Sequence, residues 1–309
     1  MSSTKQISES DKQLPYLDTF SKAAELGSFT AAAHTLAITQ AAVSQRIHAL
    51  EKELGLALFQ RRAGRVFLTE EGQTLYVYAQ KILDLHREAW QDLTGDKIPV
   101  RGELLLAAST VPSEYLLPGM LAVFHKQFPE IQVRASQTDS MGVLAQVEQG
   151  TVHLGLVGRK NESNRLDFEQ FAADEMVLVA PPEHRWSRRR RISLEQFCRE
   201  PLVVREPGSG SRWCLEQALT ERRIALSSLN IALELGGNEA IKEAVFKGVG
   251  VAVLSVLAVK KELEAGQLHR LQINDLSLDR TMFLAWDKRR ALPAPARIFR
   301  HFLRRCSSP

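Results

Sequence analysis

Apolar residues recur at helical spacing in two short segments near the start of the chain. The spacing predicts one helix over residues 29–36 and a second over Gln40–Leu54, with the turn Ala37-Ile38-Thr39 between them. The expected buried seam of the pair consists of Ala32, Leu36, Val43, Ile47, Leu50 and Leu54. This pattern is typical of a helix-turn-helix, although an ordinary helical hairpin inside a larger domain would show the same spacing.

The opposite face of the second helix is short, polar and poor in acidic residues. It carries Gln40, Ala41, Ser44, Gln45 and His48, which could enter a major groove and hydrogen-bond to base edges. The run of small alanines and the three-residue turn favour this DNA-reading interpretation over the ordinary hairpin.

A small basic hairpin is predicted directly after these helices. Leu58-Phe59 begins it, Ala63-Gly64 forms the turn, and Val66-Phe67-Leu68 returns. The tip carries Arg61, Arg62 and Arg65, which could contact phosphates or enter a minor groove. A solvated charged turn is the alternative, but a basic hairpin after a helix-turn-helix is the winged arrangement and favours DNA contact.

A long helix is predicted next, over residues 70–93. Thr69 is expected to cap it, because Glu70 and Glu71 follow in the first turn, where the helix dipole favours negative charge. Its apolar residues follow one another in steps of three and four, as in the seam of a coiled coil: Leu75, Tyr78, Ile82, Leu85, Ala89 and Leu93. So narrow a stripe favours a partner helix in a dimer over packing on the chain's own body.

Strand and helix patterns alternate from Glu103 onward, which is typical of an α/β fold. The first lobe is expected to contain strands at 103–109, 131–137, 153–158 and 281–288, with helices at 115–127, 141–148 and 294–304. The second lobe is expected to contain strands at 175–181, 201–206, 230–236, 251–255 and 268–273, with helices at 211–222 and 239–247. Two lobes joined by two crossovers imply a cleft between them.

The segment TQAAVSQRIHALEKELGLALFQRRAGRVFLTEEG, residues 39–72, resembles the N-terminal signature of the LysR-type transcriptional regulators. The resemblance is dense over residues 14–93 and looser over the rest of the chain. It implies a winged helix-turn-helix DNA-binding domain at 14–72, a dimerising linker helix at 73–93 and a hinge at 94–101. It also implies a two-lobed α/β effector domain at 102–309 that resembles type II periplasmic binding proteins, with lobe I at about 102–173 and 274–305 and lobe II at about 174–273.

The same resemblance implies partners and DNA contacts. Such regulators usually form homodimers that assemble into homotetramers on double-stranded DNA. They activate or repress nearby promoters in response to a small metabolite, with RNA polymerase as a further expected partner. By motif position Gln40, Ala41, Ser44, Gln45 and Arg65 contact DNA, and we add Arg46, Arg61 and Arg62 as candidates. One departure is Gln45, which stands where the family often has arginine; a neutral amide there would shift base preference toward adenine.

Hydroxyl and glycine-rich turns at the expected ends of strands indicate where the effector would bind, because ligands of open α/β sheets lie there, near helix N-termini. Ser109, Thr110 and Ser113 could bind a carboxylate, phosphate or sulfate, or could simply cap the next helix. The resemblance favours ligand binding over an empty bend for a second turn, which contains Gly208, Ser209, Gly210 and Ser211.

Asn238 lies in a third strand-to-helix turn and is expected to N-cap the helix that follows it. Asp139 and Arg159 stand at two other strand ends and are weaker effector candidates, for which a surface or hinge position is the favoured alternative. The expected effector is therefore a small anion.

Positive charge is unevenly distributed along the chain, whose formal net charge is +4. Residues 1–93 hold ten Lys/Arg and eleven Asp/Glu, so the presumed DNA-binding part is about neutral, and only residues 44–68 are locally basic. The densest basic run is residues 188–191, all arginine, with Arg185 nearby. We interpret it as a solvated loop, with a second nucleic-acid contact as the alternative.

Sequence features argue against several other function classes. Walker A, H-E-x-x-H and G-x-S-x-G motifs do not occur, so we expect no enzyme activity, cofactor or metal. Cys198, Cys214 and Cys306 are too widely spaced to predict a disulfide or zinc site. No apolar run approaches membrane-spanning length, and the polar start MSSTKQISESDKQ predicts a disordered tail of a cytoplasmic protein. Two alternative functions remain. A solute-binding receptor would not explain the N-terminal signature, and an enzyme on the same two-lobed fold would need an acid/base pair that the sequence does not show.

Overall fold

The computed structural model describes residues 3–62, 65–94 and 100–307, and the side chains at 3–12, 61–62, 65, 84, 87–94 and 307 lie outside that description. The chain divides into two compact units. Unit 1 contains the N-terminal part up to residue 98 together with residues 289–291, and unit 2 contains residues 99–288 and 292–309.

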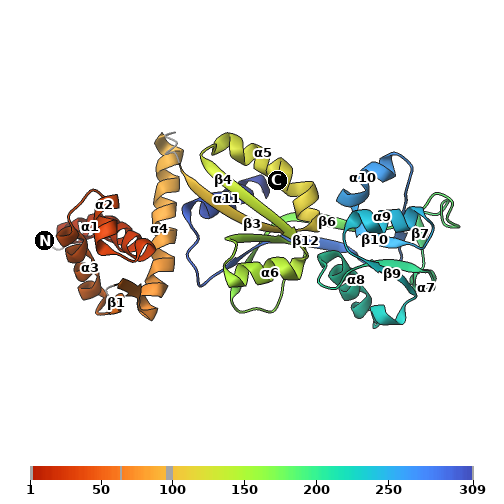
Figure 1. Ribbon diagram of the computed structural model, residues 1–309, viewed down its shortest axis with the longest axis horizontal. Helices are drawn as coiled ribbons and strands as arrows, with labels where there is room; N and C mark the ends of the chain where they lie inside the picture. Colours follow the sequence, from red (N-terminus) through yellow and green to blue (C-terminus); the bar gives the residue numbers. More distant parts are fainter. Residues whose placement is uncertain (1–2, 63–64, 95–99, 308–309) are drawn as a thin grey trace. The chain divides into compact units, whose positions relative to one another are not determined.

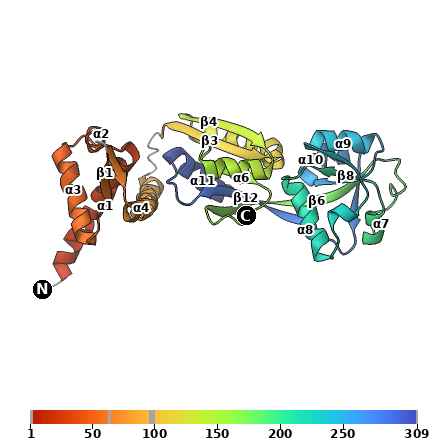
Figure 2. The same cartoon turned by 60° about the horizontal axis from the view of Figure 1, so that its bottom comes forward.

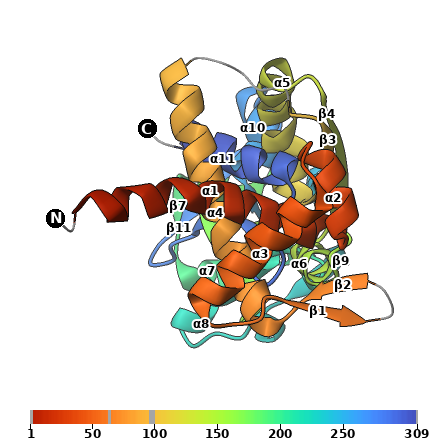
Figure 3. The ribbon, with the colours of Figure 1, turned by 90° about the vertical axis from the view of Figure 1, so that its left-hand side faces the viewer.

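Unit 1 is a helical body with a two-stranded hairpin that projects from it (Figure 3). Its elements are α1 (Ser3–Leu26), α2 (Phe29–Thr35), α3 (Gln40–Leu54), β1 (Phe59–Arg62), β2 (Arg65–Leu68) and α4 (Glu70–Thr94). The most buried side chains lie among the helices and include Phe20, Ala23, Ala32, Val43 and Ile47. The helix-turn-helix and hairpin predicted from the sequence are both present.

Two predictions for unit 1 are wrong. The apolar spacing places Leu54 in the buried seam, but its side chain is 44% exposed because α3 ends there and Gly55, with a φ of 68°, turns the chain away. The polar start of the chain predicts a disordered tail, but the backbone is helical from Ser3 onward as part of α1. Apolar periodicity identifies only helices that bury a face, so it cannot predict the first, mostly polar part of α1.

Helix α4 leaves most of its described apolar stripe open to solvent. Leu75 is partly buried against the core of unit 1, whereas Tyr78, Ile82 and Leu85 are 58%, 46% and 68% exposed. The remaining predicted members of the stripe, Ala89 and Leu93, have side chains outside the described part. The stripe therefore does not pack on the body of unit 1 along its exposed length.

Unit 2 contains two α/β lobes (Figure 1). Lobe I consists of β3 (Gly102–Ser109), η1 (Pro112–Leu116), α5 (Leu117–Gln127), β4 (Ile131–Thr138), α6 (Ser140–Gln149), β5 (Leu154–Val157) and α11 (Ala294–Ser307). Lobe II consists of β7 (Arg191–Ile192), α7 (Leu194–Cys198), β8 (Leu202–Arg205), α8 (Gly210–Glu221), η2 (Leu226–Ser228), β9 (Ile231–Leu235), α9 (Asn238–Phe246), β10 (Ala252–Ser255), α10 (Val256–Glu264) and β11 (His269–Ile273).

Two strands, β6 (Leu166–Ala180) and β12 (Asp279–Asp287), connect the lobes. They pair with each other in an antiparallel ladder that extends from Asp279 opposite Glu175 to Asp287 opposite Leu166. In lobe I, β12 also pairs with β5, and in lobe II the second part of β6 pairs with β10 and β11. The order of the main sheet is β4-β3-β5-β12-β6-β11-β7, so one sheet continues through both lobes.

Alternating strand residues of lobe I pack on opposite sides of the sheet, as a period of two requires. Leu104 and Leu106 of β3 pack with Phe124 of α5 and Phe299 of α11, which are fully buried, whereas Ala107 packs with residues of α6 (α5 and α6 in Figure 1, α6 and α11 in Figure 2). This packing fixes the carboxyl end of β3 beside the first turn of α6, which is where the predicted ligand residues lie.

Several elements of unit 2 differ from the sequence prediction. The strand predicted at 175–181 begins at Leu166, because its first half belongs to the lobe I sheet and alternates between buried and exposed residues. The helix predicted at 115–127 begins with a π-helical turn in which the N–H of Leu117 donates to the carbonyl of Pro112. Pro118, which has no N–H, follows directly. The short strand β7 and the helix α10 are not predicted.

Candidate functional site

The exposed face of α3 begins at a regular N-cap. Thr39 Oγ1 accepts a hydrogen bond from the N–H of Ala42 at 3.1 Å, so the helix starts at Gln40, as the sequence predicts. Gln40, Ala41, Gln45 and His48 are exposed and Ser44 is half-buried, whereas Val43, Ile47 and Leu50 face the core. The polar face predicted to read bases is therefore the solvent face of the helix.

Arg46 occupies a different side of α3 from these residues. Its Nη1 donates to Thr19 Oγ1 on α1 at 3.0 Å, and Thr19 is fully buried. The guanidinium therefore holds α3 against α1 in this conformation. Of the basic candidates on the hairpin, Arg61, Arg62 and Arg65 have side chains outside the described part of the chain.

Both ends of the β1–β2 hairpin are tied to the helices of unit 1. Glu51 of α3 accepts hydrogen bonds at Oε1 from the N–H groups of Leu58 (2.8 Å) and Phe59 (3.3 Å). At the other end, Thr69 Oγ1 donates to the carbonyl of Ala57 at 2.7 Å and accepts from the N–H of Gly72 at 2.9 Å, so Thr69 caps α4 as predicted. These hydrogen bonds fix the position of the hairpin relative to α3.

A pocket in unit 2 lies where lobe I meets lobe II. Its lining comes from the end of β3, the start of α6, the turn before α8 and the start of β12: Ser109, Thr110, Val111, Asp139, Ser140, Arg205, Ser209, Gly210, Ser211 and Arg280. The N-termini of α6 and α8 both contribute residues to this lining, and Asp139 and Ser209 cap those two helices. Backbone N–H groups at two helix starts thus meet at one polar pocket.

Arg205 forms the main polar bridge between the lobes. Its Nη2 donates to Thr110 Oγ1 of lobe I at 3.1 Å, and its Nη1 donates to Asn238 Oδ1 of α9 at 2.8 Å. Glu206 holds the same guanidinium in a bidentate pair, with both distances at 2.7 Å. Burial acts to raise the pKa of Glu206, but its hydrogen bonds with Arg205 and the charge of that arginine bring the pKa below its usual range.

Arg280 lies on the opposite side of the pocket, on the crossover strand β12. It forms a buried ion pair with Asp174 of β6 at 2.7 Å, and its Nη1 donates to Ser211 Oγ of α8 at 3.1 Å. Asp174 also accepts from Ser255 Oγ at 2.7 Å. Each arginine of the pocket is therefore already paired with a carboxylate, and the positive potential available to a ligand comes mainly from the helix N-termini.

Ser140 Oγ in the pocket and Asn238 Nδ2 beside it are buried donors that have no hydrogen-bond partner among the described residues, and their residues are 0% and 1% exposed. Arg280 Nη2, also in the pocket, makes no hydrogen bond either, but it lies 2.7 Å from a carboxylate oxygen of Asp174 in the ion pair. An unpaired buried polar group is destabilising, and it is found where a ligand or a bound water supplies the missing acceptor.

The glycines of the turn before α8 allow the lobes to approach each other closely. A Cβ at Gly210 would lie 2.9 Å from Ser140 Oγ, and one at Gly208, where φ is 91°, would lie 2.9 Å from Asp139 Oδ1. Any larger residue at these positions would push the two lobes apart. The glycines of this turn are therefore required for close packing of the lobes, and the ligand contact predicted for the turn stays a prediction.

Most of the residues predicted from the sequence for the effector lie in or beside this pocket. Ser109, Thr110, Asp139, Ser209, Gly210 and Ser211 line it. Ser113 does not, because it lies within the η1 turn beyond the end of β3. Arg159 stacks on Trp213, 5.4 Å from the ring centroid, and burial lowers its pKa.

One role predicted for a candidate is wrong. Asn238 is not the N-cap of α9, which is Gly237; it is the first helical residue, and its side chain faces Arg205. The sequence reading also missed Arg205 and Arg280. A charged residue at the end of the apolar run PLVV was the available signal for Arg205.

Other kinds of site are not seen in the described part of the chain. No group of three His, Cys, Asp or Glu side chains there could hold a metal ion, and all three cysteines are free thiols. None of the helices in that part has the length and apolar character needed to cross a membrane.

Comparison with known proteins identifies the family to which the chain belongs. The family model described as "LysR substrate binding domain" matches residues 98–307, and the one described as "Bacterial regulatory helix-turn-helix protein, lysR family" matches residues 14–73. The chain belongs to the LysR family. LysR-type regulators join a DNA-binding helix-turn-helix to an effector-binding domain, and unit 1 and unit 2 contain these two parts.

Two LysR-type relatives match along nearly the whole chain. The transcriptional activator CmpR of Synechocystis sp. strain PCC 6803 is 31% identical over 94% of this chain and 94% of its own length. The RuBisCO operon transcriptional regulator of Allochromatium vinosum is 33% identical over 94% of this chain and 95% of its own length. These relatives are transcriptional regulators and not enzymes, which agrees with the sequence prediction.

A solved structure supports the fold of unit 2. The CcmR regulatory domain of Synechocystis PCC6803, determined in complex with 2-PG, is 25% identical and has a TM-score of 0.62. The alignment covers 67% of this chain and 98% of that domain.

Proposed function

We propose that this LysR-type regulator binds double-stranded DNA in the cytoplasm as a dimer, with two dimers forming a tetramer. A small anion that binds in the pocket between lobes I and II changes the regulator's action on its target promoters, with RNA polymerase as the downstream partner. The proposal combines the DNA-reading surface of unit 1 with the polar pocket of unit 2.

The surface of unit 1 supports direct base reading by α3. Gln40, Ala41 and Gln45 are exposed at the start of the helix, and this is the part of a recognition helix that meets base edges. Arg46 is better suited to holding α3 in place, because it bonds to Thr19. Arg61, Arg62 and Arg65 are proposed to contact the DNA backbone from the hairpin.

The observation that carries the anion proposal is the excess of unpaired donors at the pocket. Ser140 Oγ has no acceptor, and the first N–H groups of α6 and α8 lie at the same site. An oxyanion supplies several acceptors at once, so it fits this lining better than a cation or an apolar molecule. The relative CcmR, whose domain was determined with 2-PG, gives a first probe for this chain.

Ligand binding at this pocket can be coupled to lobe closure through Arg205. The guanidinium bridges the lobes by donating to Thr110 Oγ1, and the hydroxyl of Thr110 can still donate to a bound anion. An anion there therefore adds to the contacts that hold the lobes together. Only a ligand with different affinities for two closure states can shift their populations. We propose that this shift repositions the DNA-binding units.

The test is a thermal-shift titration of the full-length protein and its Ser140→Ala variant with 2-PG, sulfate and inorganic phosphate. Ser140 Oγ has no partner, so the variant should unfold at an unchanged or slightly higher temperature without ligand. It should bind the stabilising anion about 2- to 12-fold more weakly, because one hydrogen bond contributes about 0.5–1.5 kcal/mol. Ser227→Ala, at an exposed serine of lobe II, is the matched control.

Two results would count against the anion proposal. One is that none of the three anions raises the unfolding temperature more than potassium chloride at equal ionic strength. The other is that Ser140→Ala and wild-type protein bind the stabilising anion equally well. DNA binding in the absence of anions would still stand in either case, because it depends on unit 1.

A further inference from the structure

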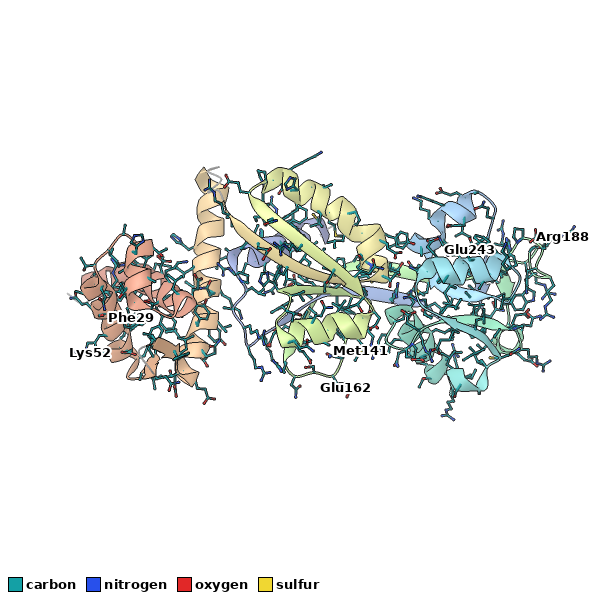
Figure 4. All side chains as sticks on the ribbon, viewed as in Figure 1. Phe29, Lys52, Met141, Glu162, Arg188 and Glu243 are labelled. Atoms are coloured by element: carbon teal, nitrogen blue, oxygen red, sulfur yellow. The ribbon has the colours of Figure 1, made fainter. Side chains whose placement is uncertain are left out.

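The loop that precedes β7 in lobe II concentrates the positive charge of the chain. Residues 182–191 contain five arginines and one glutamate, which is the same formal excess of +4 as the whole 309-residue chain carries. The remaining residues are therefore neutral overall. Figure 4 labels Arg188 at the outer edge of lobe II, among side chains that extend away from the sheet.

This arginine loop, residues 185–191, has a fixed backbone. Trp186 is only 2% exposed and anchors the loop in the core of lobe II. The N–H groups of Ser187 and Arg189 donate to the carbonyls of His184 and Trp186, each at 2.8 Å. The carbonyls of Arg189 and Arg190 are in turn held by His269 Nε2 at 2.6 Å and by the N–H of Gln272 at 3.0 Å.

The side chains at the two ends of the loop have partners within lobe II. Arg185 pairs with Glu200, and His184 Nε2 lies 2.9 Å from the same carboxylate. Arg191 Nε donates to Gln272 Oε1 at 3.0 Å. Glu200 is 7% exposed and already pairs with both Arg185 and His184. No ion pair joins the exposed Glu183 to an arginine in the described part of the chain.

The three central arginines, Arg188, Arg189 and Arg190, are exposed, and their side chains have no ion pair or hydrogen bond within the described part of the chain. Like charges on consecutive residues repel one another, and a mobile loop would let them spread apart. Here the backbone hydrogen bonds hold them together without a balancing acid. Repulsion between these charges is destabilising in the free protein, and a polyanionic partner would relieve it.

We infer that the arginine loop binds the phosphate backbone of double-stranded DNA next to the site read by α3. Guanidinium groups form paired hydrogen bonds with phosphate oxygens, and neighbouring arginines can engage successive phosphates. Binding of α3 to its site makes a contact between the loop and the adjoining duplex intramolecular, so a weak contact is sufficient where the loop reaches that duplex. Because unit 1 is nearly neutral overall, phosphate contacts by lobe II would add to the sequence-independent affinity that the hairpin arginines of unit 1 supply.

The experiment compares full-length wild-type protein with the triple variant Arg188→Gln, Arg189→Gln and Arg190→Gln. Each protein is titrated over a range of salt concentrations with two duplexes that share one site selected from a random library. The short duplex just covers the site, and the long one extends it by several helical turns on both sides. The matched control is the triple variant Arg222→Gln, Lys247→Gln and Lys260→Gln, which removes the same charge from exposed positions of lobe II.

On the long duplex, we expect the triple arginine variant to bind more weakly and to lower the salt slope by up to about 3 per chain that contacts DNA, since each phosphate contact contributes about 0.9. On the short duplex it should match wild type, and the control variant should match wild type on both. Circular dichroism and the unfolding temperature establish that all three proteins are folded.

Three outcomes would overturn the inference. The arginine variant and wild type could bind the long duplex with the same slope, which would leave an acidic protein surface as the partner of the loop. The control variant could lose as much affinity, which would make the effect one of net charge alone. The arginine variant could weaken binding to both duplexes equally, which would show that flanking DNA is not the target.

Discussion

Gln40 stands at the first position of α3, directly after the Thr39 cap, with its side chain exposed. We expect Gln40→Ala to weaken binding to a selected site by about 1–3 kcal/mol, the range for losing one bidentate base contact. Binding to a random-sequence duplex should not change, because phosphate contacts dominate there. Fluorescence anisotropy with both duplexes measures the difference, and an equal loss on both would refute base reading by this residue.

Single residues also show which parts of the pocket can be predicted from the sequence. Hydroxyl and glycine residues at strand ends could be found from pattern alone, and Thr110, Ser209 and Gly210 do line the pocket. Arg205 and Arg280 could not be found in this way, since their role depends on partners far away in the chain. Arg205 bonds to Thr110, 95 positions earlier, and Arg280 pairs with Asp174, 106 positions earlier. Local pattern shows where a strand ends and not which two ends meet.

Among the elements, the exposed apolar stripe of α4 can be tested as the proposed dimer interface. Leu85 is 68% exposed in the described stripe, so unit 1 does not need it for its own core. We expect Leu85→Glu to convert a dimer into a monomer, because a two-fold interface loses two buried leucines, roughly 3–6 kcal/mol in all. Size-exclusion chromatography with light scattering at several concentrations measures the mass.

The control for this change is Leu56→Glu, which adds the same charge at another exposed leucine of unit 1, one that is 48% exposed and lies outside α4. It should leave the mass unchanged. A Leu85→Glu protein that keeps the mass of the wild type would exclude this stripe as the interface.

Elements differ in how well the sequence predicts them, and the reason is their surroundings. Helix α3 has a capping threonine, a clear apolar side and a terminal glycine, and its bounds were predicted to the residue. Strand β6 was predicted only from Glu175, because residues 166–174 face the core on one side and solvent on the other, and they lie among charged neighbours. Helix α10 follows β10 directly, with only Ser255 between them as a cap. Both elements lie in the apolar run VAVLSVLAV, so the apolar pattern does not show where the strand ends and the helix begins.

For the molecule as a whole, acid should destabilise both lobes of unit 2. In lobe I, Glu169 is held by Arg300 and Arg304, and in lobe II Glu206 is held by Arg205. Burial acts to raise the pKa of each carboxyl, but the hydrogen bonds and charges of the arginines bring it below its usual range. A depressed pKa stabilises the folded state above the unfolded pKa of about 4.3, and this stabilisation is lost as pH falls through the folded value.

We therefore expect the unfolding temperature of the full chain to fall as pH is lowered from about 5 toward 3. Glu206→Gln should lower it at neutral pH and make its fall in acid less steep. Glu162→Gln, at an exposed loop position, should keep the wild-type profile. Differential scanning calorimetry across this range measures both effects, and identical profiles for Glu206→Gln and wild type would show that the Arg205 pair does not contribute.

The paired strands β6 and β12 restrict how one lobe can move against the other. They stay hydrogen-bonded across the boundary, with a single shift of register between Met282 and Phe283. Sliding one lobe past the other would break that ladder, whereas flexing or twisting it would keep every bond. In the function proposed above, opening would then be a rocking motion about this two-stranded ribbon, and a stiffer ribbon would require a larger difference in ligand affinity between the two closure states.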